Sequence, residues 1–458
     1  MVSEPKIWRA RSPGDLSLQM PEVSAGDVSL AVKRSQRAFR DWQHLRLEDR
    51  RAALSLCRDR LVAKREELAR LISMEIGKPL REARLELAAV IAKFELTFSD
   101  AERFLADQTI ADGPYPAVVR RRARGLAAVI SPFNFPIHLA HGAAIAYLLA
   151  GNTVLLKPSP LAANVSAAYA NEMQTILPKG VLELVQGWGE TGRAICIHPA
   201  VRSVCFTGSI AVGTALAKVL AADYSKSLAL ELGGRNDLIV FRDADLGRAA
   251  EAAADGICLT AGQRCNSTSR ILVQHEIEEK FIRKLLDSLE RYSPGDPMNE
   301  STMLGPLASK AALNRFQKLI NSPGDWLLRG EICSAVSGKR GYYVKPAIFS
   351  CPQSGCFEEE EFFSPMAVLE GFRDIDDAIG RRATTRFGLT ASVFTQSEEI
   401  FRSAAENLEV GNLYRNLPTT FSPSTLPFGG FRASGNGKPG ARGFIRFTAD
   451  EQSVQWRP

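Results

Sequence analysis

Cys265 is the residue whose type and surroundings best suit covalent chemistry, and it lies in the segment TAGQRCN at 260–266. Gly262 allows close approach of the backbone, and Arg264 supplies positive charge that favours a thiolate. One cysteine among eight is a weak signal alone, but the others lie mostly in apolar segments that suit core packing. The segment therefore predicts a nucleophile at Cys265.

Two further side chains could assist such a nucleophile. Glu231 lies in the apolar run 228–232, where a carboxylate is either a general base or a paired structural group. Asn134 lies among aromatic residues and prolines in SPFNFP at 131–136. That stiff loop would hold its amide as an oxyanion donor, and the alternative is an Asx turn.

Other positions could bind a phosphate-bearing ligand. In FTGS at 206–209 a strand meets a Gly/Ser turn, and Gly213 follows in a helix whose start would expose free N–H groups. Lys157 and Ser159 follow the apolar run 153–156, at a strand end where open α/β sheets bind ligands. A plain turn and a surface lysine are the alternatives.

The segment GWGETG at 187–192 matches the dinucleotide pattern GxGxxG. It follows the third strand of its series, however, and no acid stands about 20 residues later to hold a ribose. A glycine-rich turn explains this segment at least as well.

The elements that must position these residues alternate between strand and helix. Helical patterns cover much of 27–105, apolar runs separated by helical text follow from 126 to 232, and a second such cycle extends from 237 to about 415. Alternation of this kind predicts parallel sheets. We therefore expect two doubly wound α/β units.

Composition narrows the class of protein. The chain has 458 residues, 45% hydrophobic and 24% charged, which is typical of a globular protein of about three structural units. A net charge of +6 gives no case for a nucleic-acid groove, and the basic cluster at 120–124 is best interpreted as a solvated strand face. Without membrane-helix, signal-peptide or zinc-site patterns, we expect a cytoplasmic protein with no metal and no membrane partner.

Taken together, the segments resemble the aldehyde dehydrogenase superfamily. In the family's order they are 131–136, 155–159, 206–213, 231–234, 262–265, EFFSP at 361–365 and PFGG at 427–430. The resemblance implies a dinucleotide-binding domain at 1–111 and 126–233 and a catalytic domain at 234–420. It also implies a small β extension at 112–125 and 431–458, which joins subunits.

The resemblance implies a role for each residue in the NAD(P)-dependent oxidation of an aldehyde to a carboxylic acid. Cys265 would be the nucleophile, with Asn134 and the backbone N–H of Cys265 as oxyanion donors. Glu231 would activate water, so that the thioester is hydrolysed rather than passed to coenzyme A. The residues implied to bind NAD or NADP are Phe133, Lys157, Ser159, Gly208, Ser209, Gly213, Glu361 and Phe363.

Within the superfamily the sequence is most similar to succinylglutamate-semialdehyde dehydrogenases of the arginine succinyltransferase pathway. The similar segments are FNFPIHL at 133–139, GQRC at 262–265, TRFGL at 385–389 and STLPFGGFRASGN at 424–436. An acidic semialdehyde would suit Arg264, His138 or Arg415 near the substrate, although each could instead pair with a neighbour. A non-acidic aliphatic aldehyde, or a catalytically silent binding role, is the alternative.

Three positions depart from the family pattern. Pro160 replaces a Glu that would repel a 2′-phosphate, so we expect NADP to be accepted at least comparably with NAD, unless an acid such as Glu190 substitutes. The segment Arg235-Asn236-Asp237 ends in an acid where an Asn-Pro pair is usual, and the short lead before Asp27 is expected to lack the usual strand hairpin. Because exposed strands of the extension need covering, we expect a homodimer or homotetramer.

Overall fold

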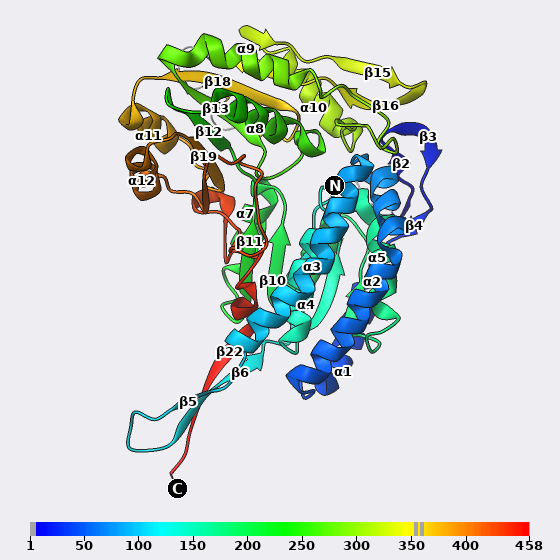
Figure 1. The fold of residues 1–458 in the computed structure, drawn as a ribbon. Coiled ribbons are helices and arrows are strands. Elements are labelled where there is room, and N and C mark those ends of the chain that lie inside the picture. The colour runs from blue at the N-terminus through cyan, green and yellow to red at the C-terminus, as the bar shows by residue number, and fades with distance from the viewer. Residues whose placement is uncertain (1–5, 352–355, 358–360, 458) are drawn as a thin grey trace.

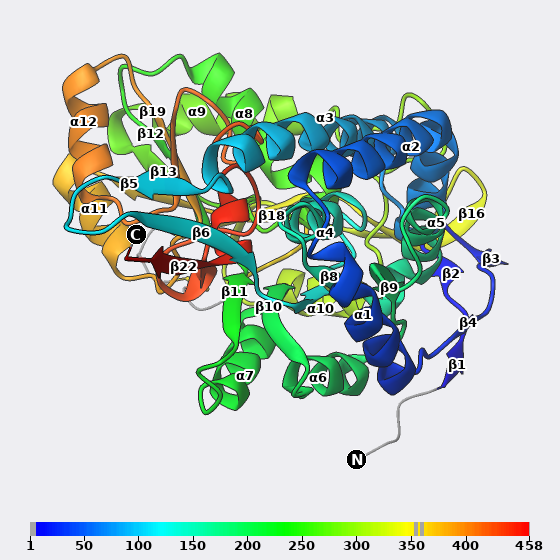
Figure 2. The same cartoon turned by 90° about the horizontal axis from the view of Figure 1, so that it is seen from below.

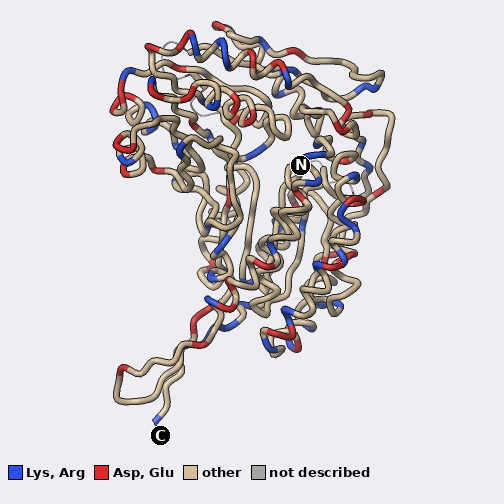
Figure 3. Tube along the Cα trace, in the orientation of Figure 1, with Lys and Arg blue, Asp and Glu red and all other residues tan. Residues whose placement is uncertain are grey.

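The computed structural model describes residues 6–351, 356–357 and 361–457. Two α/β units lie one above the other in Figure 1, and a thin ribbon of strands extends away from the lower unit. Lys and Arg are interspersed with Asp and Glu along both units (Figure 3). The prediction of two doubly wound α/β units is confirmed by the two mostly parallel sheets.

The first unit is built on a sheet whose strands run in the order β21-β11-β10-β7-β8-β9. They are β7 (Leu126–Ile130), β8 (Thr153–Lys157), β9 (Leu182–Leu184), β10 (Val201–Thr207), β11 (Ser227–Glu231) and β21 (Gly435–Asn436). The chain runs from β7 to one side and then returns to β10 on the other. In such sheets the carboxyl ends at this reversal bound a crevice.

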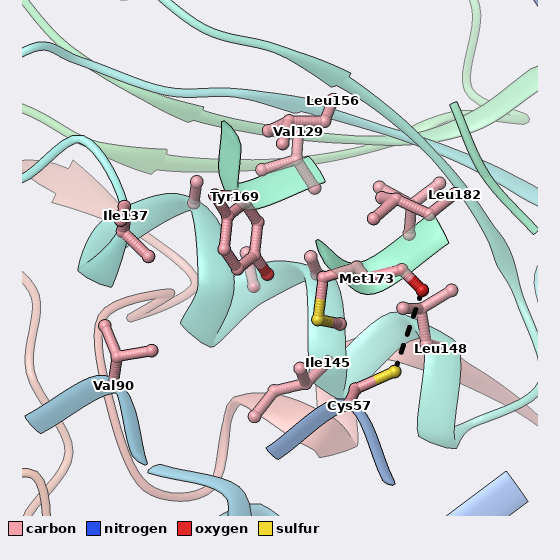
Figure 4. Close-up of a cluster of buried hydrophobic side chains, with 14 of the residues drawn as sticks. Cys57, Val90, Val129, Ile137, Ile145, Leu148, Leu156, Tyr169, Met173 and Leu182 are labelled. Carbon is pink, nitrogen blue, oxygen red and sulfur yellow. Dashed lines mark hydrogen bonds between the residues drawn. The ribbon is translucent and has the colours of Figure 1, made fainter. Parts of the chain in front are cut away.

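Helices cover both faces of this sheet. Their bounds are α1 (Val28–Trp42), α2 (Leu47–Ile76), α3 (Leu80–Phe104), α4 (His138–Leu149), α5 (Ala163–Gln174), α6 (Gly189–Ile197) and α7 (Ile210–Leu220), with a 3₁₀ turn η1 (Pro160–Ala162). The long helices α2 and α3 lie side by side in both Figure 1 and Figure 2. Figure 4 shows the core that they close, where Val90 of α3 and Cys57 of α2 pack with Ile145 of α4.

The second unit has a sheet in the order β14-β17-β18-β13-β12-β19-β20. Its strands are β12 (Asn236–Val240), β13 (Thr268–Gln274), β14 (Asp325–Leu328), β17 (Ala347–Ser350), β18 (Met366–Phe372), β19 (Thr390–Phe394) and β20 (Asn412–Arg415). Its helices are α8 (Leu246–Cys258), α9 (Glu278–Leu289), α10 (Lys310–Ile320), α11 (Ile375–Ala383) and α12 (Glu398–Asn407), beside a hairpin of β15 (Ile332–Val336) and β16 (Lys339–Val344). Only residues 232–235 separate β11 from β12, so the chain passes directly from one sheet to the other.

A small antiparallel sheet forms the ribbon that extends from the first unit. It contains β5 (Gln108–Ile110), β6 (Ala117–Ala123) and β22 (Ala449–Gln455), and so begins before the expected boundary at 112. Arg121 of β6 pairs with Glu451 of β22, and Arg124, directly after β6, pairs with Asp450 of β22. The basic cluster at 120–124 is therefore a strand face, as the sequence indicated.

The expectation that the lead before Asp27 lacks a strand hairpin is wrong. Strands β2 (Arg11–Ser12) and β3 (Asp15–Gln19) form a hairpin around the two-residue turn Pro13-Gly14, beside the short pair β1 (Ile7–Trp8) and β4 (Val23–Ser24). The hydroxyl of Tyr343 donates a hydrogen bond to the carbonyl of Gly14 at 2.8 Å. This contact with β16 stabilises strands that are too short to be recognised from alternation alone.

Asp237, which departs from the family pattern, lies in a buried ion-pair cluster. Its two carboxylate oxygens accept hydrogen bonds from the guanidinium of Arg270, each at 2.8 Å. Arg382 of α11 approaches the same carboxylate at 3.1 Å. These arginines lower the pKa of Asp237 against the effect of its burial, and the cluster ties β12 to β13 and α11.

We predict that Asp237→Asn destabilises the protein by about 3–5 kcal/mol, because it removes the buried carboxylate that pairs with both Arg270 and Arg382. Urea denaturation followed by fluorescence measures the change. Glu331→Gln, which breaks the exposed pair with Lys345, is the control and should change stability little. Equal midpoints for the two variants would show that the Asp237 cluster contributes no more than a surface pair.

Candidate active site

A cavity of about 410 Å³ lies over the carboxyl ends of β7, β8, β10 and β11, where the two sheets approach each other. The second unit contributes residues that precede its strands, such as Cys265 before β13 and Glu361 before β18. The residues singled out from the sequence that line the cavity are Phe133, Asn134, Lys157, Ser159, Gly208, Ser209, Glu231, Cys265, Glu361 and Phe363. Its volume suits a small-molecule site.

Cys265 and Glu231 face each other in this cavity. The carboxyl group of Glu231 interacts with the Cys265 thiol, is 1% exposed and has one buried oxygen without a hydrogen-bond partner. Burial, with a smaller contribution from the neighbouring carboxyl group of Glu361, raises the pKa of Glu231 to about 8 against the lowering effect of Cys265. Burial and the Glu231 carboxylate likewise raise the pKa of Cys265 well above its ordinary value. At rest, the pair therefore favours a protonated thiol beside a carboxyl group poised to exchange protons.

Cys265 is reached through a backbone turn of unusual conformation. After α8, the turn η2 (Leu259–Gly262) places Thr260, Ala261 and Gly262 in succession at φ 55°, 53° and 69°. At Gly262 a Cβ atom would lie 2.2 Å from the carbonyl oxygen of Ser364, so only glycine fits there. Left-handed Thr and Ala persist only where the surroundings hold them, and they cluster at functional sites.

Asn134 joins the loops of the two units. Its side-chain amide donates one hydrogen bond, at 2.8 Å, to the carbonyl oxygen of Gln263 in the Cys265 loop. A side-chain amide carries two N–H groups, so this bond fixes the orientation of the group while the second N–H stays available. The arrangement differs from an Asx turn, because the partner is 129 residues away.

The other end of the cavity carries groups that suit a dinucleotide. Ser209 caps α7 by accepting the backbone N–H of Val212 at 3.4 Å, and the start of this helix lines the cavity beside Gly208. Lys157 is buried rather than a surface lysine. Gly213 lies outside the cavity lining. A Cβ atom there would lie 2.5 Å from Leu232, so this glycine permits α7 to pack closely against the sheet.

Glu361 and Phe363 line the cavity together with Phe133. The N–H of Gly234 donates to the Glu361 carboxylate at 3.3 Å, and burial raises the pKa of Glu361 to about 7. The rings of Phe133 and Phe363 meet edge to face, with centroids 5.9 Å apart. Helix-end N–H groups and a lysine suit phosphates, a carboxylate suits ribose hydroxyls, and aromatic walls suit a flat ring. The donor set therefore fits a nicotinamide dinucleotide.

Comparison with known proteins agrees with this geometry. The model of the aldehyde dehydrogenase family matches residues 9–454. The chain belongs to the aldehyde dehydrogenase family. It is thus an NAD(P)-dependent oxidoreductase, as the resemblance implied.

Several relatives of this aldehyde dehydrogenase cover nearly all of its length. The N-succinylglutamate 5-semialdehyde dehydrogenase of Burkholderia multivorans is 34% identical over 445 residues, which cover 95% of this chain and 90% of that protein. An NAD-dependent aldehyde dehydrogenase from Sinorhizobium meliloti has 30% identity and a TM-score of 0.93, covering 99% of this chain and 92% of its own. A betaine aldehyde dehydrogenase from Staphylococcus aureus, solved with NAD⁺, has 26% identity and a TM-score of 0.93, with 98% and 93% covered.

The three side chains considered for an acidic substrate are held in the dehydrogenase in different ways. Arg264 pairs with Glu82 at 2.7 Å, and Arg415 donates to the backbone carbonyls of Thr395 and Gln396. Burial lowers the pKa of His138 well below its usual range, which favours the neutral ring. The structure therefore supports the structural interpretation for both arginines.

Sequence reasoning missed other residues of the site. Arg315 of α10 lines the cavity and donates a hydrogen bond to the backbone carbonyl of Glu361, and Gln263 orients Asn134 through its backbone. Gln263 lay inside a recognised segment, but its function depends on the carbonyl oxygen rather than on the side chain. No local pattern marks Arg315. None of the helices in the described part of the chain is long and apolar enough to cross a membrane.

We predict that thioester hydrolysis rises with pH, with a midpoint near pH 8 and a plateau above about pH 9. Glu231 must be ionised to accept a proton from water, and its raised pKa keeps it protonated at lower pH. Single-turnover decay of the acyl-enzyme measured from pH 6 to 10 tests this. Glu361→Gln should keep the inflection and Glu231→Gln should lose it. An inflection that persists in Glu231→Gln would assign the titration to another group.

Proposed function

We propose that this chain oxidises an aldehyde to a carboxylic acid through a thioester on Cys265, and that its substrate is an acidic semialdehyde such as N-succinylglutamate 5-semialdehyde. The observation that supports the reaction is the convergence of the Cys265 thiol, the Glu231 carboxyl group and the Asn134 amide in one cavity. The substrate is supported by the name of relatives that are 34% identical over nearly the whole chain.

The covalent and proton-transfer steps of this reaction are assigned to Cys265, Glu231 and Asn134. Glu231 takes the thiol proton as the sulfur of Cys265 bonds to the aldehyde carbon, and the carbonyl oxygen becomes an alkoxide. The free N–H of the Asn134 amide and the backbone N–H of Cys265 stabilise that charge. A bound nicotinamide dinucleotide would supply the hydride acceptor. Glu231 releases the thiol proton to solvent. It then takes a proton from a water molecule, whose oxygen bonds to the thioester carbon as the carbon–sulfur bond breaks and Cys265 leaves as a thiolate.

We predict that Cys265→Ala abolishes both reduced-cofactor formation and acyl-enzyme. Glu231→Gln should slow the burst of reduced cofactor, because the thiol proton must then pass to water, while its amplitude stays at one equivalent per site. Hydrolysis should slow by about 10²–10⁴-fold, the usual contribution of a general base. Stopped-flow absorbance at 340 nm, the band of reduced nicotinamide, separates the phases. Cys333→Ala is the matched control, since Cys333 is a partly exposed free cysteine outside the cavity. Full turnover by Cys265→Ala would contradict the proposal.

The substrate assignment is tested separately by comparing kcat/KM for N-succinylglutamate 5-semialdehyde, succinate semialdehyde and a neutral aliphatic aldehyde of similar length. We expect the first to be oxidised fastest. Equal or higher kcat/KM for the neutral aldehyde would support the non-acidic alternative. No reduced cofactor with any aldehyde would support a silent binding role.

For the cofactor, we propose that NADP is accepted at least comparably with NAD. Pro160 lines the cavity beside Lys157 and Ser159 and brings no carboxylate to that wall. Glu190, in the first turn of α6 next to Gly189 of the cavity wall, is the acid that could replace the missing one. A carboxylate close to the 2′ position would select against NADP by charge repulsion.

We predict that Pro160→Glu lowers kcat/KM for NADP about tenfold or more and leaves kcat/KM for NAD within about threefold, as one repelling charge near a phosphate is worth over 1 kcal/mol. Glu190→Gln is the companion variant and should change the ratio little. Strong preference of the parent for NAD that Glu190→Gln relieves would show that Glu190 performs the selection.

We also propose that the sheet of β5, β6 and β22 pairs with a second copy of the chain. It projects from the first unit with β22 and β5 as its edge strands, and such edges need covering. We predict a dimer or tetramer by light scattering at micromolar concentration. Deletion of residues 449–458 should shift the mass toward the monomer, whereas a stable monomeric parent would contradict the proposal.

A further inference from the structure

Near its N-terminal end, helix α3 carries two buried carboxylates outside the cavity. Glu82 and Glu86 stand four residues apart and therefore share one face of the helix. Each is only 3% exposed. Burying a carboxylate is costly unless it is hydrogen-bonded, so their partners indicate what they are for. Each of the two binds a different loop of the active site.

Glu82 binds the loop that leads to Cys265. Its carboxylate accepts the backbone N–H of Thr260 at 3.0 Å and the hydroxyl of Thr260 at 2.8 Å. It also accepts a hydrogen bond from the guanidinium of Arg264 at 2.7 Å, the residue next to the nucleophile. Thr260 opens the left-handed turn described above. Glu82 therefore binds both ends of this loop, namely Thr260 at its strained start and Arg264 beside Cys265 at its end.

Glu86 binds the loop that carries Asn134. One carboxylate oxygen accepts the backbone N–H groups of Ile137 and His138, each at 3.1 Å, where α4 begins. Ile137 provides no side-chain cap of its own, so Glu86 acts as the N-terminal cap of α4 from another helix. Its second oxygen accepts a hydrogen bond from Lys78, whose side chain is fully buried. The end of the Asn134 loop is thus fixed to α3.

Phe135 contacts a hydrogen-bond partner of each of the two carboxylates. Its ring lies against the Lys78 ammonium group, 3.8 Å from the ring centroid, and against the Arg264 guanidinium at 5.1 Å. The partner of Glu86 and the partner of Glu82 therefore both contact the aromatic residue next to Asn134. The two loops, whose own bond is the one between Asn134 and Gln263, are tied to the same stretch of α3.

We propose that Glu82 and Glu86 are positioning residues, and that their spacing on α3 sets the separation between the Cys265 thiol and the Asn134 amide. The inference rests on the roles proposed above for Cys265 and Asn134. A displacement of about 1 Å between reacting groups can lower a rate about 10²-fold, so a rigid helix is a suitable support for both loops.

The test uses two reactions of the full-length protein that need no dinucleotide and no particular aldehyde. Acyl transfer from p-nitrophenyl acetate requires both the thiol and the oxyanion donors, whereas alkylation of Cys265 by iodoacetamide requires the thiol alone. Glu86→Gln should lower acyl transfer about tenfold or more and leave alkylation unchanged. Glu82→Gln should lower both. Asp100→Asn is the matched control on α3, because Asp100 binds a backbone N–H and an arginine far along the chain, at Gly443 and Arg442.

Combination with Asn134→Ala separates positioning from a general loss of stability. If Glu86 acts through Asn134, Glu86→Gln should cause less than a twofold further loss in the Asn134→Ala background, because coupled residues are not additive. Should Glu86→Gln fail to fold, Lys78→Met combined with Glu86→Gln removes both buried charges and takes its place.

Equal effects of Glu86→Gln and Asp100→Asn on acyl transfer, or a full additional loss in the Asn134→Ala background, would overturn the inference alone. Acyl transfer that does not depend on Asn134 in the parent would refute the proposed role of Asn134 as well.

Discussion

The hydrogen bond between the Asn134 amide and the Gln263 carbonyl is the contact on which the rest of the site depends. It joins a loop at the carboxyl end of the first sheet to a loop at the amino end of the second. Residues 232–235 link β11 directly to β12, so Glu231 at the end of one strand and Asn236 at the start of the next are close in sequence. Asn236 in turn donates to the carbonyl of Cys265 at 2.8 Å. Both loops are thereby held from two directions.

Burial gives this junction its electrostatic character. Glu231 and Glu361 lie within one cavity, and the low polarity of their surroundings raises the pKa of both. The Cys265 thiol shares this environment, so its proton is retained until a carboxylate can receive it. A more open cavity would bring the pKa of the carboxyl group and that of the thiol closer to their ordinary values. The same enclosure that disfavours charge at rest strengthens each hydrogen bond to a developing alkoxide.

Much of the fold and of the candidate active site could be predicted from the sequence. The strands at 126–130 and 153–157 are short apolar runs followed by loops, and their order follows from alternation with helices. Cys265, Glu231 and Asn134 belong to recognisable segments, and the structure brings them together. Contacts between distant residues could not be predicted in this way. Glu82 binds Thr260 across 178 residues, and nothing local to either segment signals the pairing.

The dependence on distant partners also explains why the N-terminal hairpin was not predicted and why the roles of the cationic side chains stayed open. The β2–β3 hairpin depends on Tyr343, more than 300 residues later, and not on a pattern within the hairpin. Arg264 could be read as a receptor for a substrate carboxylate until its pairing with Glu82 was seen. The same residue types stabilise the fold and bind ligands, and only their contact partners in the structure distinguish the two roles.

Peptide mass spectrometry of Glu231→Gln, quenched in acid after mixing with aldehyde and oxidised cofactor, tests the covalent chemistry most directly. Acid preserves a thioester while stopping further reaction. The expected result is one acyl group, with the mass of the substrate's acid less water, on the peptide that contains Cys265 and on no other cysteine peptide. Reduced cofactor formed in one equivalent per site with no acyl group on Cys265, or with the group on another residue, would contradict the assignment of Cys265 as the nucleophile.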